Sequence, residues 1–250
     1  PEMKRVLLWL ALLLPVAGNA EQDPSARMLE AQQAYDAQDY ARALDHYDGI
    51  LRDGWSSLPL HFNRGNALAR LGQEGAAIAS YRTALLINPR DADAAANLAF
   101  VLKEAGMPAH RLSWLDRSFG GLSSREWQVL LIAAWWAFAL LAAVALLAPT
   151  CLRWTRIPLL LCAGIGLLAL AGAGYWRFLN HRPDVVLLRD ESVRFAPLAS
   201  STPHFQAPEG DTLTLVSQTG EWLRVTSGQK EGWLPADACA IVKLASPSAP

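Results

Sequence analysis

The chain has 250 residues, of which 52% are hydrophobic, and its 22 basic residues nearly balance its 23 acidic residues. This length allows one or two domains, and the hydrophobic fraction lies slightly above the range usual for soluble globular proteins. The near-neutral charge and the lack of long Lys and Arg runs argue against nucleic acid as a partner. Because the apolar residues gather in three blocks, we expect a multi-domain membrane protein with water-facing domains.

The first 20 residues have the features of a signal peptide. Lys4 and Arg5 precede an apolar run at residues 6–14, and small residues follow it at positions 17–20. We expect cleavage after Ala20. The apolar run is shorter than the roughly 20 helical residues that cross a hydrocarbon core, so an uncleaved anchor is the weaker alternative.

Residues 21–106 contain an internal repeat of 34 residues, seen when residues 58–91 are aligned with residues 24–57. The second copy has small residues for close helix crossings, large residues between them and a terminating proline. They are Gly65, Leu68, Leu71, Gly72, Ala77, Ile78, Tyr81, Ala84, Asn88 and Pro89. This set resembles the tetratricopeptide repeat (TPR) motif, which implies an all-α TPR solenoid of two repeats with a capping helix at residues 92–105.

The first helices of such repeats line a concave face that binds extended peptides. The resemblance assigns to this face Tyr35, Phe62, Asn63, Asn66, Arg70, Asn97 and Phe100. Some TPR domains clamp a terminal carboxylate with asparagines and lysines, and Asn66 and Asn97 match the asparagines. Met28 and Phe62 stand where lysines are expected, so the favoured interpretation of these asparagines is repeat consensus.

Residues 107–126 form a basic and aromatic linker, with Trp114, Arg117 and Phe119 as its main features. Such a segment suits the headgroup surface of a membrane, and an irregular linker is an equal alternative.

Residues 127–176 predict a transmembrane hairpin with spans at 128–148 and 157–176, because about 20 helical residues reach about 30 Å. Ser123 and Glu126 form a capping box before the first span. Trp127 and Trp176 at the outer ends of the spans, and Trp154 in the turn, are expected as interfacial anchors. Small residues suit close packing of the two helices, or alternatively contact with another membrane protein. They are Ala133, Ala137, Ala139, Ala143, Gly164, Gly166, Gly172 and Gly174.

Residues 177–244 alternate apolar and polar residues between turn clusters, which is typical of a short-stranded barrel. The step Gly232-Trp233-Leu234-Pro235 resembles bacterial SH3-like domains, where glycine permits a bend and tryptophan covers the barrel end. Trp222 and Trp233 would then form an aromatic groove for a peptide or cell-wall stem peptide; the alternative places Trp233 in the core and Trp222 on a half-exposed face. Residues 245–250 are expected to be disordered.

The sequence lacks the usual marks of catalysis and of cofactor binding. The five histidines are dispersed, no nucleophile elbow or phosphate loop occurs, and the three cysteines form no CxxC pair. We therefore expect no enzyme activity, no metal and no cofactor.

The order of signal peptide, TPR, two spans and SH3-like domain resembles the TPR proteins of the aerotolerance (Bat) operon, the BatE-like family. The signal peptide predicts export of the N-terminal domain, so the two spans would return the chain to the same side and both soluble domains are expected to be extracytoplasmic. The resemblance implies a scaffold in the bacterial inner membrane, in stress-tolerance complexes with membrane proteins that carry von Willebrand factor A domains. A cell-wall anchor that binds peptidoglycan through the SH3-like domain is the alternative. A chaperone of cytochrome maturation is a weaker possibility, without haem-handling residues to support it.

Overall fold

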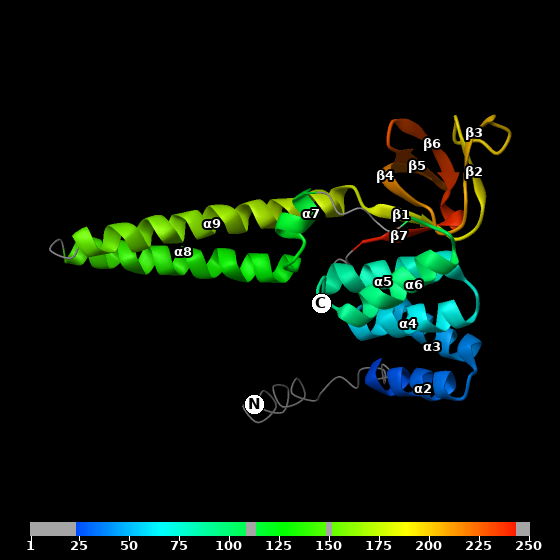
Figure 1. Ribbon diagram of the computed structural model, residues 1–250, viewed down its shortest axis with the longest axis horizontal. Coiled ribbons are helices and arrows are strands. Elements are labelled where there is room, and N and C mark those ends of the chain that lie inside the picture. The colour runs from blue at the N-terminus through cyan, green and yellow to red at the C-terminus, as the bar shows by residue number, and fades with distance from the viewer. Residues whose placement is uncertain (1–23, 109–113, 149–151, 244–250) are drawn as a thin grey trace, which may run out of the picture. The chain divides into compact units, whose positions relative to one another are not determined.

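The computed structural model describes residues 24–108, 114–148 and 152–243 (Figure 1). The predicted signal peptide at 1–20 and the predicted tail at 245–250 lie outside the described residues. The chain divides into two compact units, residues 1–55 and 56–250, and each is described by itself. The division falls inside the predicted TPR domain at 21–106.

The first unit contains one helical pair, α2 (Pro24–Asp36) and α3 (Tyr40–Arg52). Gln38 takes a positive φ of 63° in the turn between them. Asp39 then caps α3 by accepting a hydrogen bond from the backbone N–H of Arg42. The buried residues of the pair are Ala31, Ala34, Ala43, Tyr47 and Ile50, so three small residues and two large ones form its apolar face.

The second unit begins with three helices, α4 (Leu58–Arg70), α5 (Glu74–Ile87) and α6 (Ala92–Glu104). Helices α2, α4 and α6 begin at residues 24, 58 and 92, so the 34-residue period is realised in the helix starts. A Cβ on Gly65 would lie 2.7 Å from the buried ring of Tyr81. The glycine is therefore required where α4 crosses α5.

Two long helices, α8 (Ser124–Leu147) and α9 (Leu152–His181), are apolar enough to cross a membrane. They are antiparallel, because Gly166 lies opposite Ala134 and Gly172 lies against the ring of Trp127. A Cβ on Gly164 or Gly174 would meet no atom within 4 Å, so only part of the predicted glycine set packs between the helices. The predicted capping box of Ser123 and Glu126 is present, with both reciprocal hydrogen bonds.

The side chains of Trp127 and Trp176, which were expected as interfacial anchors, are both buried within the protein, at 5% and 3% exposure. The indole N–H of Trp127 donates to the Phe119 carbonyl at 3.0 Å, and that of Trp176 donates to the Leu122 carbonyl at 2.9 Å. An indole needs one acceptor, and here the linker backbone supplies it in place of the headgroup region.

The linker between the repeat helices and the hairpin contains a short helix, α7 (Trp114–Phe119). The ring of Phe119 packs 5.9 Å from Trp127 and 6.0 Å from Tyr175, measured between ring centroids. Trp114 is 70% exposed. Helix α7 thus packs against the base of the hairpin through Phe119 and exposes the indole of Trp114.

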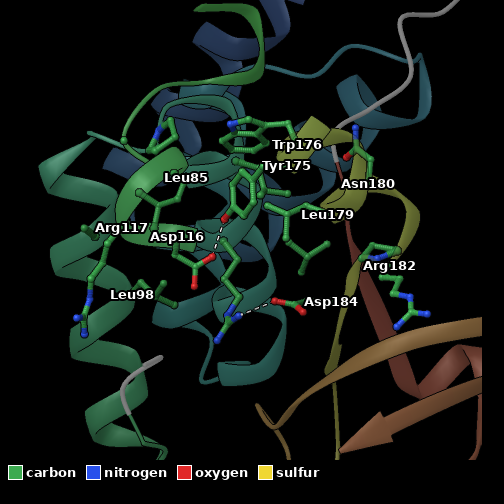
Figure 2. Close-up of a pocket in the computed structure, with 18 residues that line it drawn as sticks. Leu85, Leu98, Asp116, Arg117, Tyr175, Trp176, Leu179, Asn180, Arg182 and Asp184 are labelled. Atoms are coloured by element: carbon green, nitrogen blue, oxygen red, sulfur yellow. Dashed lines mark hydrogen bonds and ion pairs between the residues drawn. The ribbon is translucent and has the colours of Figure 1, made fainter. Parts of the chain in front are cut away.

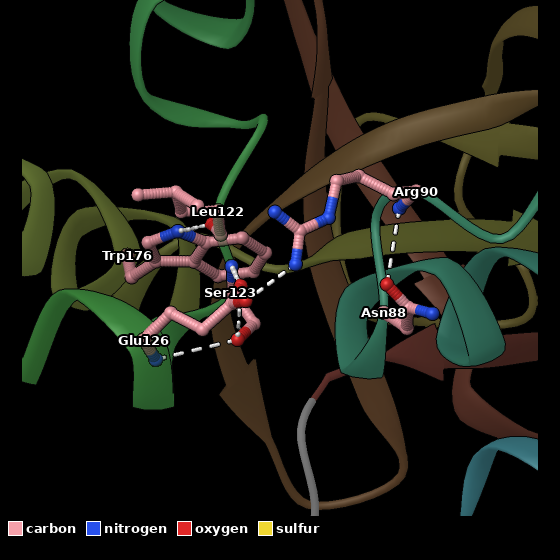
Figure 3. Close-up of polar contacts among 6 residues, drawn as sticks. All are labelled: Asn88, Arg90, Leu122, Ser123, Glu126 and Trp176. Atoms are coloured by element: carbon pink, nitrogen blue, oxygen red, sulfur yellow. Dashed lines mark hydrogen bonds and ion pairs between the residues drawn. The ribbon is translucent and has the colours of Figure 1, made fainter. Parts of the chain in front are cut away.

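A polar contact joins the repeat to the hairpin, as Figure 3 shows. The guanidinium of Arg90 pairs with the Glu126 carboxylate, which also accepts hydrogen bonds from Ser123. Arg90 in turn donates its backbone N–H to the side chain of Asn88, at 3.2 Å. The carboxylate that caps α8 is therefore also held by the turn that ends α5.

The C-terminal part is a seven-stranded antiparallel sheet with the order β3-β2-β6-β5-β4-β1-β7. Its strands are β1 (Asp184–Leu187), β2 (Glu191–Arg194), β3 (Pro203–Ala207), β4 (Thr212–Thr219), β5 (Trp222–Ser227), β6 (Lys230–Pro235) and β7 (Cys239–Val242), with a 3-10 turn at Ala236–Ala238. Its core comprises Val185, Leu187, Val193, Ala207, Leu213, Leu223, Val225 and Leu234.

The expected small barrel is not formed, because β3 and β7 end the strand order and do not pair with each other. Helix α5 packs against β1 and the edge strand β7. The role of Gly232 also differs from the expected bend. A Cβ there would overlap the side chain of Val193 and lie 2.9 Å from the Arg194 carbonyl, so this glycine allows β6 to approach β2.

The contact between α5 and the sheet is close and partly polar. The N–H of Gly75 donates to the Glu209 carboxylate at 2.9 Å, and Arg82 pairs with Asp184 at 3.1 Å. A Cβ on Gly75 would overlap the carbonyl oxygen of Leu187. The first turn of α5 can therefore carry only glycine at this position without moving the strand.

Candidate functional site

The predicted peptide-binding face centres on a hydrogen-bonded link between three helices. The side-chain oxygen of Asn66 on α4 accepts from the Tyr81 hydroxyl at 2.7 Å and from the Asn97 amide at 2.9 Å. Tyr81 lies on α5 and Asn97 on α6. Both lone pairs of the Asn66 oxygen are therefore used within the repeat, which gives this residue a structural role.

The other predicted residues of this face differ in exposure. Phe100 is 63% exposed, Arg70 is also exposed, and Phe62 and Asn63 are half-buried. The ring of Phe62 lies 6.1 Å from that of Tyr81. Tyr35 belongs to the first unit, where its ring packs edge-on against Tyr40 at 5.1 Å. Of the predicted residues, the structure thus joins Asn66 and Asn97 directly and places Phe62 against Tyr81. Tyr35 lies in the first unit, which is described by itself.

A buried histidine lies on α4, among the residues that sequence reasoning left without a role. The ring Nε2 of His61 is 2.8 Å from the Ser56 hydroxyl, and the residue is 9% exposed. Burial lowers the pKa of His61 to about 4, and the nearby Arg64 guanidinium adds to the shift. The imidazole is therefore neutral near pH 7 and contributes to packing.

The two tryptophans of the predicted groove lie on neighbouring strands and share one face of the sheet. Trp222 on β5 is opposite Pro235, and Trp233 on β6 is opposite Arg224. This register makes the indoles diagonal neighbours on the face opposite the core residues Leu223 and Leu234. Both indoles are half-buried.

Charge accompanies these tryptophans. Arg224 lies directly opposite Trp233 and two residues after Trp222 on the same face, and its guanidinium donates to the Glu231 carboxylate at 2.6 Å. The face therefore combines two indole surfaces with an ion pair that is accessible to solvent, a combination that can stack against a planar or sugar-like group.

A pocket of about 550 Å³ lies between α5, α6, α7, the end of α9 and the start of β1 (Figure 2). Its wall is mainly apolar and comes from Leu85, Leu86, Pro89, Leu98, Trp176, Leu179 and Val242. Its polar members include Arg82, Asp116, Arg117, Tyr175, Asn180, Arg182 and Asp184. This size and composition fall within the range of small-molecule sites.

Two polar pairs cross the middle of the pocket wall. The Tyr175 hydroxyl donates to Asp116 at 2.5 Å, and Arg82 donates to Asp184 at 3.1 Å. The Nε of Arg82 is buried and has no hydrogen-bond partner in the described part of the chain. Burial lowers the pKa of Arg82, and the Asp184 carboxylate opposes this effect.

Sequence reasoning did not find this pocket. Its lining comes from helices of the repeat, the linker, the end of the second long helix and two strands. No motif or spacing connects these segments, because they meet only in the folded chain, through the docking of α5 on β1 and β7, the pair of Arg90 and Glu126, and the bond between Tyr175 and Asp116. The one local signal was the basic and aromatic composition of the linker, which includes Arg117.

Comparison with known proteins adds one family. The tetratricopeptide repeat family matches residues 59–91, which correspond to the second copy of the predicted repeat. No match to this chain is found among curated proteins or among solved structures. The matched residues form α4, α5 and the turn that leads to α6. The chain therefore contains a tetratricopeptide repeat, a module generally associated with protein–protein interaction.

Proposed function

We propose that this chain is a non-catalytic, membrane-anchored scaffold that binds a protein partner on the repeat face formed by α4 and α6. The observation that carries the proposal is the tetratricopeptide repeat at residues 59–91. Its α5 packs against the C-terminal sheet, which leaves the Asn66 side of the repeat as the surface for a partner.

The chemistry of this face suits an extended polypeptide. The link between Asn66, Asn97 and Tyr81 holds three helices in a fixed arrangement, so little ordering is needed when a partner binds. Phe100, at 63% exposure, follows Asn97 by three residues on α6 and offers an apolar anchor on the same helix face. An aromatic anchor next to polar groups is typical of sites where a few residues carry most of the binding energy.

The two long helices support the anchoring part of the proposal, because each is long and apolar enough to span a bilayer. The side chains that point away from the helix pair are apolar, for example Trp136 at 68% and Leu147 at 87% exposure. We place both soluble parts on the extracytoplasmic face of a bacterial inner membrane, within a Bat-type stress-tolerance complex. Membrane proteins with von Willebrand factor A domains are the proposed partners.

Affinity purification of the full chain from mild detergent tests the scaffold proposal. We expect the wild-type chain to recover membrane proteins and Phe100→Ser to lose them. Phe195→Ser is the matched control, because Phe195 is similarly exposed, at 59%, but lies after β2. Recovery of no membrane protein by the wild type, or equal recovery by Phe100→Ser, would refute the proposal. Reporter fusions at Ser25 and at the C-terminus test the sidedness, and reporters on opposite faces would overturn it.

A second candidate function is peptidoglycan binding, favoured by the adjacent half-buried indoles of Trp222 and Trp233. The test is sedimentation of the full detergent-solubilised chain with purified peptidoglycan. Replacement of both tryptophans by alanine should abolish co-sedimentation. Trp55→Ala, which removes an indole that is 51% exposed in the first unit, should leave it unchanged. A wild-type chain that stays in the supernatant would contradict this alternative.

A further inference from the structure

We propose that the pocket between α5, α6, α7 and the end of α9 binds one anionic phospholipid. An acyl chain would lie along the leucine wall, with the anionic headgroup stabilised by the positive potential of Arg117 and Arg182 on the two sides of the pocket. The inference rests on the proposed insertion of α8 and α9 into a bilayer, and it goes beyond the scaffold function because it assigns a ligand to a separate site.

The apolar wall of the pocket suits the acyl chain of the ligand. Leu85 and Leu86 come from α5, Leu98 from α6 and Leu179 from α9. These side chains enclose a space of about 550 Å³ that water fills poorly and hydrocarbon fills well. A small hydrophilic anion would leave this wall without a complementary group.

The charge of the pocket lining suits the anionic headgroup of the ligand. Asp184 is paired with Arg82, and Asp116 accepts the Tyr175 hydroxyl. Arg117 and Arg182 also line the pocket, and neither has a carboxylate partner among the described residues. In Figure 2 they lie on opposite sides of the two polar pairs. The pocket therefore carries excess positive charge, which complements a phosphate group.

The position of the pocket on α9 identifies the source of the ligand. The contact between Gly172 and Trp127 marks where α9 passes the start of α8. From Trp154 to this point α9 has roughly 20 residues, or about 30 Å, which matches a hydrocarbon core. Tyr175, Leu179 and Arg182 follow that stretch and line the pocket, so the pocket lies at headgroup level.

Exposed aromatic side chains at the same end agree with this position. Phe178 is 55% exposed and lies under the Arg182 guanidinium, 5.9 Å from the ring centroid. Trp114 on α7 is 70% exposed. Aromatic and basic side chains together are typical of the boundary between hydrocarbon and water, and there a lipid can enter the pocket directly from the bilayer.

Native mass spectrometry of the full chain in mild detergent tests the proposal. The titrated probes are phosphatidylglycerol, phosphatidylcholine with the same acyl chains, and glycerol phosphate. We expect one phosphatidylglycerol per chain, bound at least tenfold more tightly than phosphatidylcholine, and no complex with glycerol phosphate. Arg117→Gln with Arg182→Gln should weaken phosphatidylglycerol binding at least tenfold.

Two further variants separate the pocket from general surface charge. Arg125→Gln with Arg177→Gln removes two exposed arginines that are outside the pocket lining, and it should retain wild-type affinity. Ala95→Phe fills the pocket from an exposed position on α6 and should prevent binding although both pocket arginines remain. Circular dichroism of each variant checks that the helices and sheet are intact.

The proposal is overturned by equal affinity for the two lipids, by glycerol phosphate binding as tightly as phosphatidylglycerol, by equal losses in the two arginine pairs, or by full binding in Ala95→Phe. Alkaline extraction of membranes that contain the chain separates this test from the proposed anchoring. Release of the chain would refute membrane insertion, whereas the detergent titration still reports whether the pocket binds the lipid.

Discussion

The substitution Gly75→Ala tests the docking of α5 on the sheet. The added Cβ would overlap the carbonyl oxygen of Leu187 and lie 3.0 Å from Cγ of Glu209. The Leu187 carbonyl also accepts the N–H of Gly210, at 2.9 Å. Because the obstacle is backbone, the strand or the helix must move. Overpacking typically costs about 1–3 kcal/mol, and the hydrogen bond from Gly75 to Glu209 is lost with it, so we expect a cost of about 3 kcal/mol.

Hydrogen exchange of the full chain in detergent measures this cost locally. A loss of about 3 kcal/mol corresponds to roughly a hundredfold faster exchange, and we expect it in peptides covering 184–188 and 208–212. The pair β5–β6 should keep its protection, because no contact of Gly75 reaches it. Unchanged exchange in the first two peptides, or uniform acceleration over the whole chain, would refute the docking described here.

Four further predictions concern the helices. Gly65→Ala should destabilise the protein by about 1–2 kcal/mol, since overpacking against a buried ring exceeds the gain in helix propensity. Gly49→Ala, where the nearest side-chain atom to a Cβ is 3.7 Å away, should stabilise it by up to about 1 kcal/mol; thermal unfolding followed by circular dichroism distinguishes the two signs. The pKa of His61 is lowered to about 4 in the folded state. The contribution of the neutral imidazole to the free energy of unfolding is therefore complete above about pH 6.5. The free energy of unfolding should then fall by about 3 kcal/mol between pH 6.5 and 4. Denaturant titrations at several pH values measure this fall, and a His61→Gln variant should lack it. Trp176→Phe removes the hydrogen bond to the Leu122 carbonyl and should destabilise the protein by about 1 kcal/mol. Limited proteolysis should then cleave the linker faster than in the wild type, and an equal rate would contradict this prediction.

Much of the local structure could be predicted from the sequence, because its causes are local. The 34-residue spacing predicted where α4 and α6 begin, and Ser123 with Glu126 predicted the start of α8. The predicted span at 157–176 lies inside α9, which continues to His181. In each case neighbouring residues determine the outcome, through capping, helix termination or a continuous apolar stretch.

The contacts between distant segments could not be predicted in this way. An apolar helix face indicates that another element covers it, but it does not identify that element. Nothing in the sequence around Gly75 indicated that this residue lies against the carbonyl oxygen of Leu187. The buried position of Trp127 was missed for a similar reason, since an indole N–H is satisfied equally by a headgroup or by a carbonyl such as that of Phe119. The pocket depends on such contacts, so its residues were not recognised as a group.

The burial of α5 has a practical consequence for dissecting this chain. The helix is covered on nearly all sides, with Gly75, Ala77, Ile78, Ala79, Ser80, Tyr81 and Ala84 buried, and part of that cover is the sheet. A fragment limited to residues 21–106 would expose this surface to water and would tend to aggregate. A binding defect in such a truncation would report the missing cover of α5, whereas single substitutions in the intact chain report the binding face itself.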